Sequence, residues 1–165
     1  MIVYHPFDDV YHCFSRILLI VYRLPVKEYD LKTIQILDFY FLFPGLLKKI
    51  RLPNELRIYR PYINGLRDSY CMINNIKSAM IHLEHQINDV VHYMAAYELV
   101  SIERIKENKV LLINKNNYGQ LVSRVNNYDN DLLDFLVNTL AKIPLEGKNG
   151  LKSRTGIFEY RYDNE

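Results

Sequence analysis

The stretch MINNIKSAMIHLEHQINDVVHYMAAYELVSIERIKENKVLLI (residues 72–113) decides the predicted fold. Its first half places apolar residues every three to four positions, which is the period of an amphipathic helix. A polar break at residues 84–86 divides this half, so the pattern predicts two consecutive helices. From Leu99 the apolar spacing changes to two, and a predicted turn at residues 106–109 separates two short runs, as in a β-hairpin. Helix, turn, helix and two-stranded ribbon is the order of a winged helix-turn-helix domain.

Two further helices are predicted upstream of this stretch. Asp8 and Asp9 can cap a helix whose apolar side chains recur at helical spacing until Pro25 ends it. Asp30 is the predicted cap of a second helix, which is so densely apolar that it should be buried nearly all round. We therefore expect this second helix to form the centre of the core, and the Pro-Gly pair at residues 44–45 to end it.

The downstream part completes a mainly α fold with a small β-hairpin. Helices are predicted at about residues 118–125 and 130–143, and the alternating GIFEYRY (residues 156–162) predicts a final strand. The expected organisation is a single compact domain over residues 1–165. Its parts are an N-terminal helical part (1–60), a winged-helix-like part (61–143) and a C-terminal glycine-bearing loop and strand (144–165).

Composition and charge limit the class of protein. The chain has 165 residues, of which 49% are hydrophobic and 24% charged, and this excludes a disordered chain. The two cysteines form no metal or disulfide pattern, and the N-terminal residues lack the order of a signal peptide, so we expect a cytoplasmic protein. No apolar run approaches the ~20 residues of a bilayer span, so no membrane contact is predicted. The net charge is only +2, so any basic surface must be local.

DNA binding is the usual role of a winged helix, but the predicted recognition helix argues against it. Residues 87–98 contain no Lys or Arg to neutralise phosphates or to contact guanine edges. The predicted wing carries a weak basic edge formed by Arg104, Lys106 and Lys109, which either touches DNA phosphates or is ordinary solvated charge. The winged helix is therefore also a candidate scaffold for binding other proteins.

No catalytic, cofactor or metal site is predicted. The segment GKNGLKSRTG (residues 147–156) resembles a phosphate-binding loop, but Leu151 separates the glycine from the lysine and the predicted helix lies before it. His82 and His85 are one helical turn apart without the Glu of a helical zinc motif. The sequence thus provides no nucleophile and base at a recognised spacing.

Three stretches carry a resemblance to a known family. They are YHPFDDVYHCFSRILLIV (residues 4–21), ILDFYFLFPGLLKKIRLP (36–53) and IPLEGKNGLKSRTGIFEYRYD (143–163). In this order they resemble the middle component of ABC-three-component defence systems, a group related to the small subunit of Lamassu-type systems.

The resemblance implies a non-enzymatic subunit in bacterial defence against phage or plasmids. Its implied partners are an SMC/Rad50-like ABC ATPase and an effector nuclease, and double-stranded DNA would be reached through the complex. The implied partner-binding residues lie near the C-terminus and are Lys148, Lys152, Arg154, Tyr160 and Arg161. The glycines of this segment either shape a charge-presenting loop or serve only to allow positive φ. The alternative function is a winged-helix DNA-binding transcriptional regulator.

Overall fold

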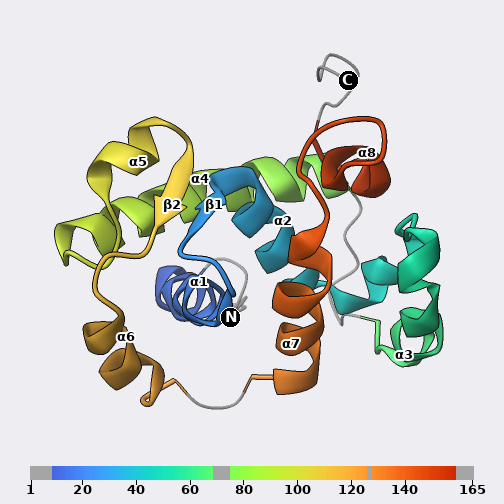
Figure 1. The fold of residues 1–165 in the computed structure, drawn as a ribbon, viewed down its shortest axis with the longest axis horizontal. Helices are drawn as coiled ribbons and strands as arrows, with labels where there is room; N and C mark the ends of the chain where they lie inside the picture. The colour runs from blue at the N-terminus through green and yellow to red at the C-terminus, as the bar shows by residue number, and fades with distance from the viewer. Residues whose placement is uncertain (1–8, 69–74, 126–127, 159–165) are drawn as a thin grey trace, which may run out of the picture.

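The structure is a computed structural model that describes residues 9–68, 75–125 and 128–158. The predicted fold class is confirmed: the described chain is mainly α-helical and contains a small two-stranded antiparallel sheet (Figure 1). Helix α1 (Val10–Arg23) lies at the centre, where it contacts α2 (Leu31–Leu42), α4 (Ile76–Ala96), α6 (Lys115–Val122) and α7 (Asn130–Asn138).

The two predicted N-terminal helices are present with the expected boundaries. Asp9 caps α1, since its carboxylate accepts hydrogen bonds from the backbone amides of Tyr11 and His12. Helix α2 starts after Asp30 and is buried on nearly all sides, which confirms its place in the core. Asp30 makes no side-chain cap bond among the described contacts. The chain then forms two short 3₁₀ helices, η1 (Pro44–Lys49) and η2 (Asn54–Tyr59), followed by α3 (Arg60–Gly65).

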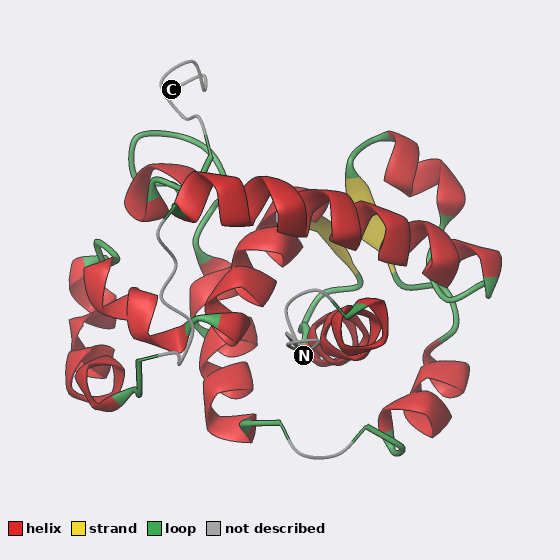
Figure 2. Cartoon of the chain, turned by 180° about the vertical axis from the view of Figure 1, so that it is seen from behind, coloured by secondary structure: helices red, strands yellow, loops and turns green. Residues whose placement is uncertain are grey.

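The predicted helix-turn-helix is wrong, because α4 is one continuous helix of 21 residues. It passes behind α2 in Figure 1 and in front of α2 in Figure 2. The polar residues 84–86 do not break it because the segment holds no glycine or proline. Gln86 is itself buried and continues the stripe of Leu83, Ile87 and Val90, while His85 lies on the exposed side. The polar run therefore passes from the exposed side of the helix at His85 to its buried side at Gln86.

The predicted ribbon is also corrected. Its first strand is replaced by helix α5 (Ile102–Lys106), whose first turn is capped by the Ser101 hydroxyl. The second run forms β2 (Lys109–Leu111), but β2 pairs with the distant β1 (Glu28–Asp30) in antiparallel register. A single bridge between Val100 and Leu112 is what remains of the expected hairpin. There is consequently no wing next to a recognition helix in the described residues.

The C-terminal part agrees with the prediction in outline. Asp129 caps α7 by accepting from the amide of Leu132, and the short 3₁₀ helix η3 (Leu140–Lys142) extends it almost to the expected end. The glycine-bearing segment contains an unpredicted short helix, α8 (Leu151–Thr155). The expected strand at residues 156–162 lies largely outside the described residues. No helix in the ranges 9–68, 75–125 and 128–158 is both long and apolar enough to cross a bilayer.

Candidate interaction surfaces

The glycines of the C-terminal segment have backbone roles. Gly147 and Gly156 adopt positive φ values of 89° and 66°, which favour glycine. At Gly150 a Cβ atom would overlap the backbone carbonyl of Glu146. The loop closes on itself because the Leu151 amide donates to the Pro144 carbonyl at 2.7 Å, which places the buried Leu151 side chain in the core. The glycine pattern therefore allows a tight loop to dock α8.

Lys152, one of the residues implied to bind a partner, is buried and pairs with a carboxylate of its own chain. Its side chain is only 6% exposed, and its Nζ lies 2.9 Å from Glu146 Oε1. Lys148 is exposed on the preceding loop, and its carbonyl accepts a hydrogen bond from the Ser153 hydroxyl. Tyr160 and Arg161 lie outside the described residues. Of the implied partner-binding residues that the structure describes, Lys148 and Arg154 thus lie at the surface.

Arg154 and Arg51 link α8 to the connector between η1 and η2. Arg154 donates from Nη1 to the Arg51 carbonyl at 2.9 Å and from Nε to the Asn149 carbonyl at 2.6 Å. In return, Arg51 donates from Nη2 to the Ser153 carbonyl at 2.8 Å, and its amide donates to the Arg154 carbonyl. Two guanidinium groups from positions far apart in the sequence are therefore fixed next to each other by uncharged carbonyl groups.

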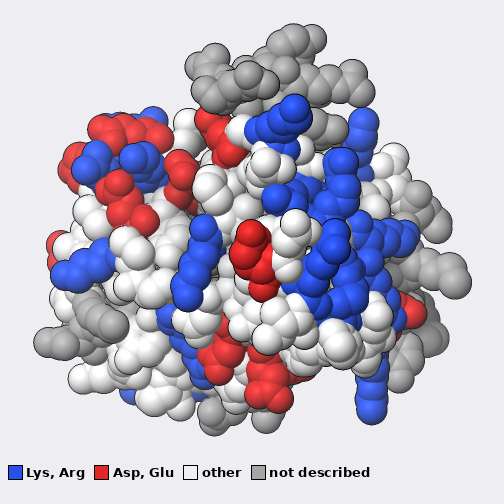
Figure 3. Space-filling view, turned by 45° about the vertical axis from the view of Figure 1, so that its right-hand side comes forward, with Lys and Arg blue, Asp and Glu red and all other residues white. Residues whose placement is uncertain are grey.

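These arginines belong to a larger positive surface, which we call the basic face. Figure 3 shows Lys and Arg atoms gathered on the side of the molecule that carries η1, η2, α3 and α8. The basic face consists of Lys48, Lys49, Arg51, Arg57, Arg60, Arg67, Lys142, Lys148 and Arg154. Six of its nine members lie within residues 48–67, a run of positive charge that could have indicated the face, and the fold brings Lys142, Lys148 and Arg154 to the same side.

The predicted basic edge at residues 104–109 is largely neutralised within the chain. Arg104 Nε lies 3.0 Å from one carboxylate oxygen of Glu28, and Lys109 Nζ lies 3.4 Å from the other. Arg104 also pairs with Glu107, and the hydrogen bond that its guanidinium donates to that carboxylate raises the pKa of Arg104. Lys106 is exposed. Two of the three cations, Arg104 and Lys109, are thus already paired with carboxylates of the same chain.

A second surface, the tyrosine groove, lies between the start of α1 and the end of α4. It is a hollow of about 550 Å³ lined by Val10, Tyr11, Phe14, Tyr93 and Tyr97. Tyr11 and Tyr97 are 84% and 71% exposed. The spacing of Tyr93 and Tyr97, one helical turn apart, is the sequence signal that could have indicated one wall of the groove. The other wall could not be predicted, because it depends on how α1 packs across α4.

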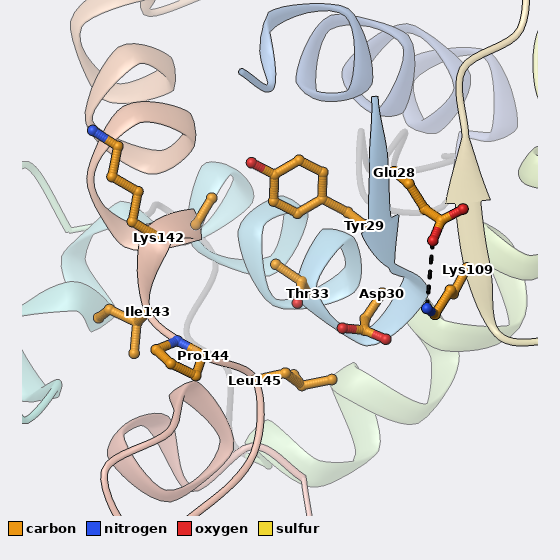
Figure 4. A pocket seen from close by; sticks show the side chains of 10 residues that line it. Glu28, Tyr29, Asp30, Thr33, Lys109, Lys142, Ile143, Pro144 and Leu145 are labelled. Atoms are coloured by element: carbon orange, nitrogen blue, oxygen red, sulfur yellow. Dashed lines mark hydrogen bonds and ion pairs between the residues drawn. The ribbon is translucent and has the colours of Figure 1, made fainter. Parts of the chain in front are cut away.

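A smaller polar hollow of about 220 Å³ lies between β1 and the segment after η3 (Figure 4). Tyr29 and Thr33 line one side, and Ile143 and Pro144 line the other. Glu28 at its edge is already paired with Lys109, and burial raises the pKa of the Tyr29 phenol, which keeps it protonated. The hollow is smaller than the ~300–1,000 Å³ of typical small-molecule sites. The protonated Tyr29 phenol is not an activated nucleophile or base.

Within the part of the chain that the structure describes, no three His, Cys, Asp or Glu side chains come together as metal ligands. No curated protein and no solved structure matches the chain. A family model, ABC-three component (ABC-3C) system Middle Component 5, matches residues 2–163. Because this match spans nearly the whole sequence, the chain belongs to the family of ABC-3C system middle components of type 5.

Proposed function

We propose that this chain is a non-catalytic adaptor in an anti-phage or anti-plasmid defence complex. In this proposal it bridges an SMC/Rad50-like ABC ATPase and an effector nuclease, as in Lamassu-type systems, and the complex works in the cytoplasm. Membership of a family named as the middle component of a three-component system supports the need for partner subunits. The observation that carries the proposal is the tyrosine groove, which offers such a subunit a place to dock.

The groove has the properties of a protein-binding surface. Tyrosine is enriched at protein interfaces because its ring buries a large apolar area and its hydroxyl can still form hydrogen bonds. Here three tyrosines surround an apolar hollow of about 550 Å³, next to a second hollow that shares Phe14 and Tyr97 and extends towards α6. A side chain or short helix of a partner subunit would remove these rings from water, which provides a strong driving force for association.

The C-terminal loop is the second proposed contact. Lys148 and Arg154 lie at the surface there and can contact a partner, whereas Lys152 pairs with Glu146 of its own chain. These two cations would face an acidic surface of the other partner, so that the two subunits bind to separate sides of this chain. The alternative function, a winged-helix regulator, loses its main support, because α4 provides no separate recognition helix.

The test is co-purification of the complete three-component system from a host that expresses all three genes, with an affinity tag on this chain. The wild-type chain should recover both the ATPase and the nuclease. Tyr93→Glu with Tyr97→Glu should lose one of them, because charge in the groove opposes burial of the rings. Ile81→Glu is the matched control, since Ile81 lies on the same helix and is 58% exposed, compared with 57% for Tyr93.

The expected result is loss of one partner in the tyrosine variant and retention of both in the Ile81→Glu control. Recovery of both partners by the tyrosine variant would remove the groove from the interface. If the wild-type chain recovers neither partner, the bridging role itself is wrong.

A further inference from the structure

The basic face concentrates charge far beyond the average of the chain. Residues 48–67 contain six basic side chains and one acidic side chain, a net charge of +5. The whole chain carries only +2, so the remaining residues are net negative by three. Such a local excess is costly, because like charges repel each other unless counterions or a ligand neutralise them.

Within the described ranges of the chain, most of these cations have no carboxylate partner. Lys48 pairs with Asp68, with Nζ 3.0 Å from Oδ1. By contrast, Arg60 donates to the carbonyls of Lys48 and Ile50 at 3.2 and 3.1 Å, and Arg51 donates to the Ser153 carbonyl. Carbonyl groups hold a guanidinium in place without cancelling its charge. Arg51 and Arg60 are therefore fixed cations whose charge is left for an external anion, among the residues that the structure describes.

A groove runs beside these arginines. It has a volume of about 430 Å³, and Lys142 and Arg154 line it together with the ring of Tyr59 and one carboxylate, that of Glu55. The Tyr59 ring is supported from behind by Phe135, with ring centroids 5.4 Å apart. On the other side of Tyr59 a separate hollow contains Asp131 and Asp134, which marks an acidic boundary. The positive surface is thus confined to the side of η1, η2 and α8.

We propose that the basic face binds the phosphate backbone of a nucleic acid, with the strand lying along the groove beside Tyr59. Protein–DNA interfaces are much more positive than protein–protein interfaces, which are depleted in lysine. A chain of phosphates also matches cations that are spread over several segments, and a fixed aromatic ring can stack on an exposed base. The basic edge at residues 104–109 is a poorer candidate, since Arg104 and Lys109 are already paired.

This inference goes beyond the proposed bridging role: Lys148 and Arg154 belong to both surfaces, but the test uses the isolated chain and leaves these two residues unchanged. The experiment measures fluorescence anisotropy of labelled DNA, either a duplex of about 20 base pairs or a single strand of similar length, between about 50 and 200 mM KCl. Lys49→Glu with Arg57→Glu is the test variant, since both side chains are exposed and make no described side-chain contact. Lys27→Glu with Arg124→Glu is the control, because it makes the same change in net charge at exposed positions elsewhere.

We expect the wild-type chain to bind DNA with a roughly micromolar Kd at low salt and a steep salt dependence. The test variant should bind at least about ten-fold more weakly, and the slope of log K against log salt should fall by about two, one for each lost phosphate contact. The control should keep both the affinity and the slope. A higher affinity for the duplex or for the single strand identifies which form of DNA the basic face binds.

Several results would overturn the proposal. The proposal is wrong if the wild-type chain does not bind DNA at about 50 mM KCl. It is also wrong if the test and control variants lose the same DNA affinity, or if the control variant alone loses affinity. Competition by polyglutamate as effective as that by unlabelled DNA would instead assign the face to an acidic protein. Circular dichroism checks that both variants are folded, and Lys49→Gln with Arg57→Gln replaces the test variant if it is not.

Discussion

Arg16 of α1 and Asp38 of α2 form a bidentate ion pair inside the protein. Arg16 Nε lies 2.7 Å from Asp38 Oδ1, and Arg16 Nη2 lies 3.1 Å from Asp38 Oδ2. The two side chains are 3% and 0% exposed. Burial alone would lower the pKa of Arg16, but the charge and hydrogen bond of Asp38 outweigh it and raise that pKa. Arg16 therefore stays charged, and its two hydrogen bonds to Asp38 fix the relative position of the two central helices.

Removing one member of this pair should destabilise the protein strongly. Arg16→Met leaves the Asp38 carboxylate buried without its partner, and we expect the free energy of unfolding to fall by about 3–5 kcal/mol. The double variant Arg16→Met with Asp38→Leu should recover much of this loss, because no unpaired charge remains. Urea denaturation followed by circular dichroism measures both effects.

Arg23→Met is the control on the same helix. It breaks an exposed pair with Asp134, at 3.0 Å, and should cost no more than about 1 kcal/mol. Strictly additive effects of Arg16→Met and Asp38→Leu would show that the buried pair has no coupling energy.

Cys13 should be unreactive in the folded protein and should make stability fall at alkaline pH. Burial, and secondly the charge of Asp38, raise the pKa of the Cys13 thiol from 9.0 to about 12. The folded state therefore keeps the proton that the unfolded chain loses above pH 9.0. The contribution of this group to stability is complete below pH 9.0 and is lost as the pH rises towards 12.

The measurement uses Cys71→Ser, which leaves Cys13 as the remaining thiol of the two in the sequence. Labelling with a thiol reagent near neutral pH should be slow in buffer and fast in denaturant. Between pH 9.0 and 12, Cys13→Ala should lose less stability than the parent. Rapid labelling of the folded protein would contradict the burial of this thiol.

Lys152 and Lys148 should respond differently to the same substitution. Lys152→Glu would place a second carboxylate next to Glu146 at a buried position, and we expect a loss of several kcal/mol of unfolding free energy. Lys148→Glu, at an exposed position four residues earlier, should change stability by less than about 0.5 kcal/mol. Thermal unfolding of the two variants checks this, and equal melting temperatures would show that Lys152 has no structural role.

The helices with strong local signals were predictable. Asp9 and Pro25 mark the two ends of α1, and the dense apolar run after Asp30 predicts a buried α2. Helix α4 was predicted with a false break, because residues 84–86 are polar although they contain no residue that ends a helix. Amphipathic helices are recognisable in a sequence because their hydrogen bonds and capping contacts join residues close together in the chain.

The sequence by itself determined the mainly α-helical class, the capped helices and the uneven distribution of charge. Only the tertiary structure decided that β2 pairs with β1, some 80 positions earlier, and that Lys152 turns inward while Arg154 meets Arg51. It likewise brought Tyr11 and Tyr93 to one groove. The physical reason is that these contacts join residues far apart in the chain, and packing of the whole core selects them.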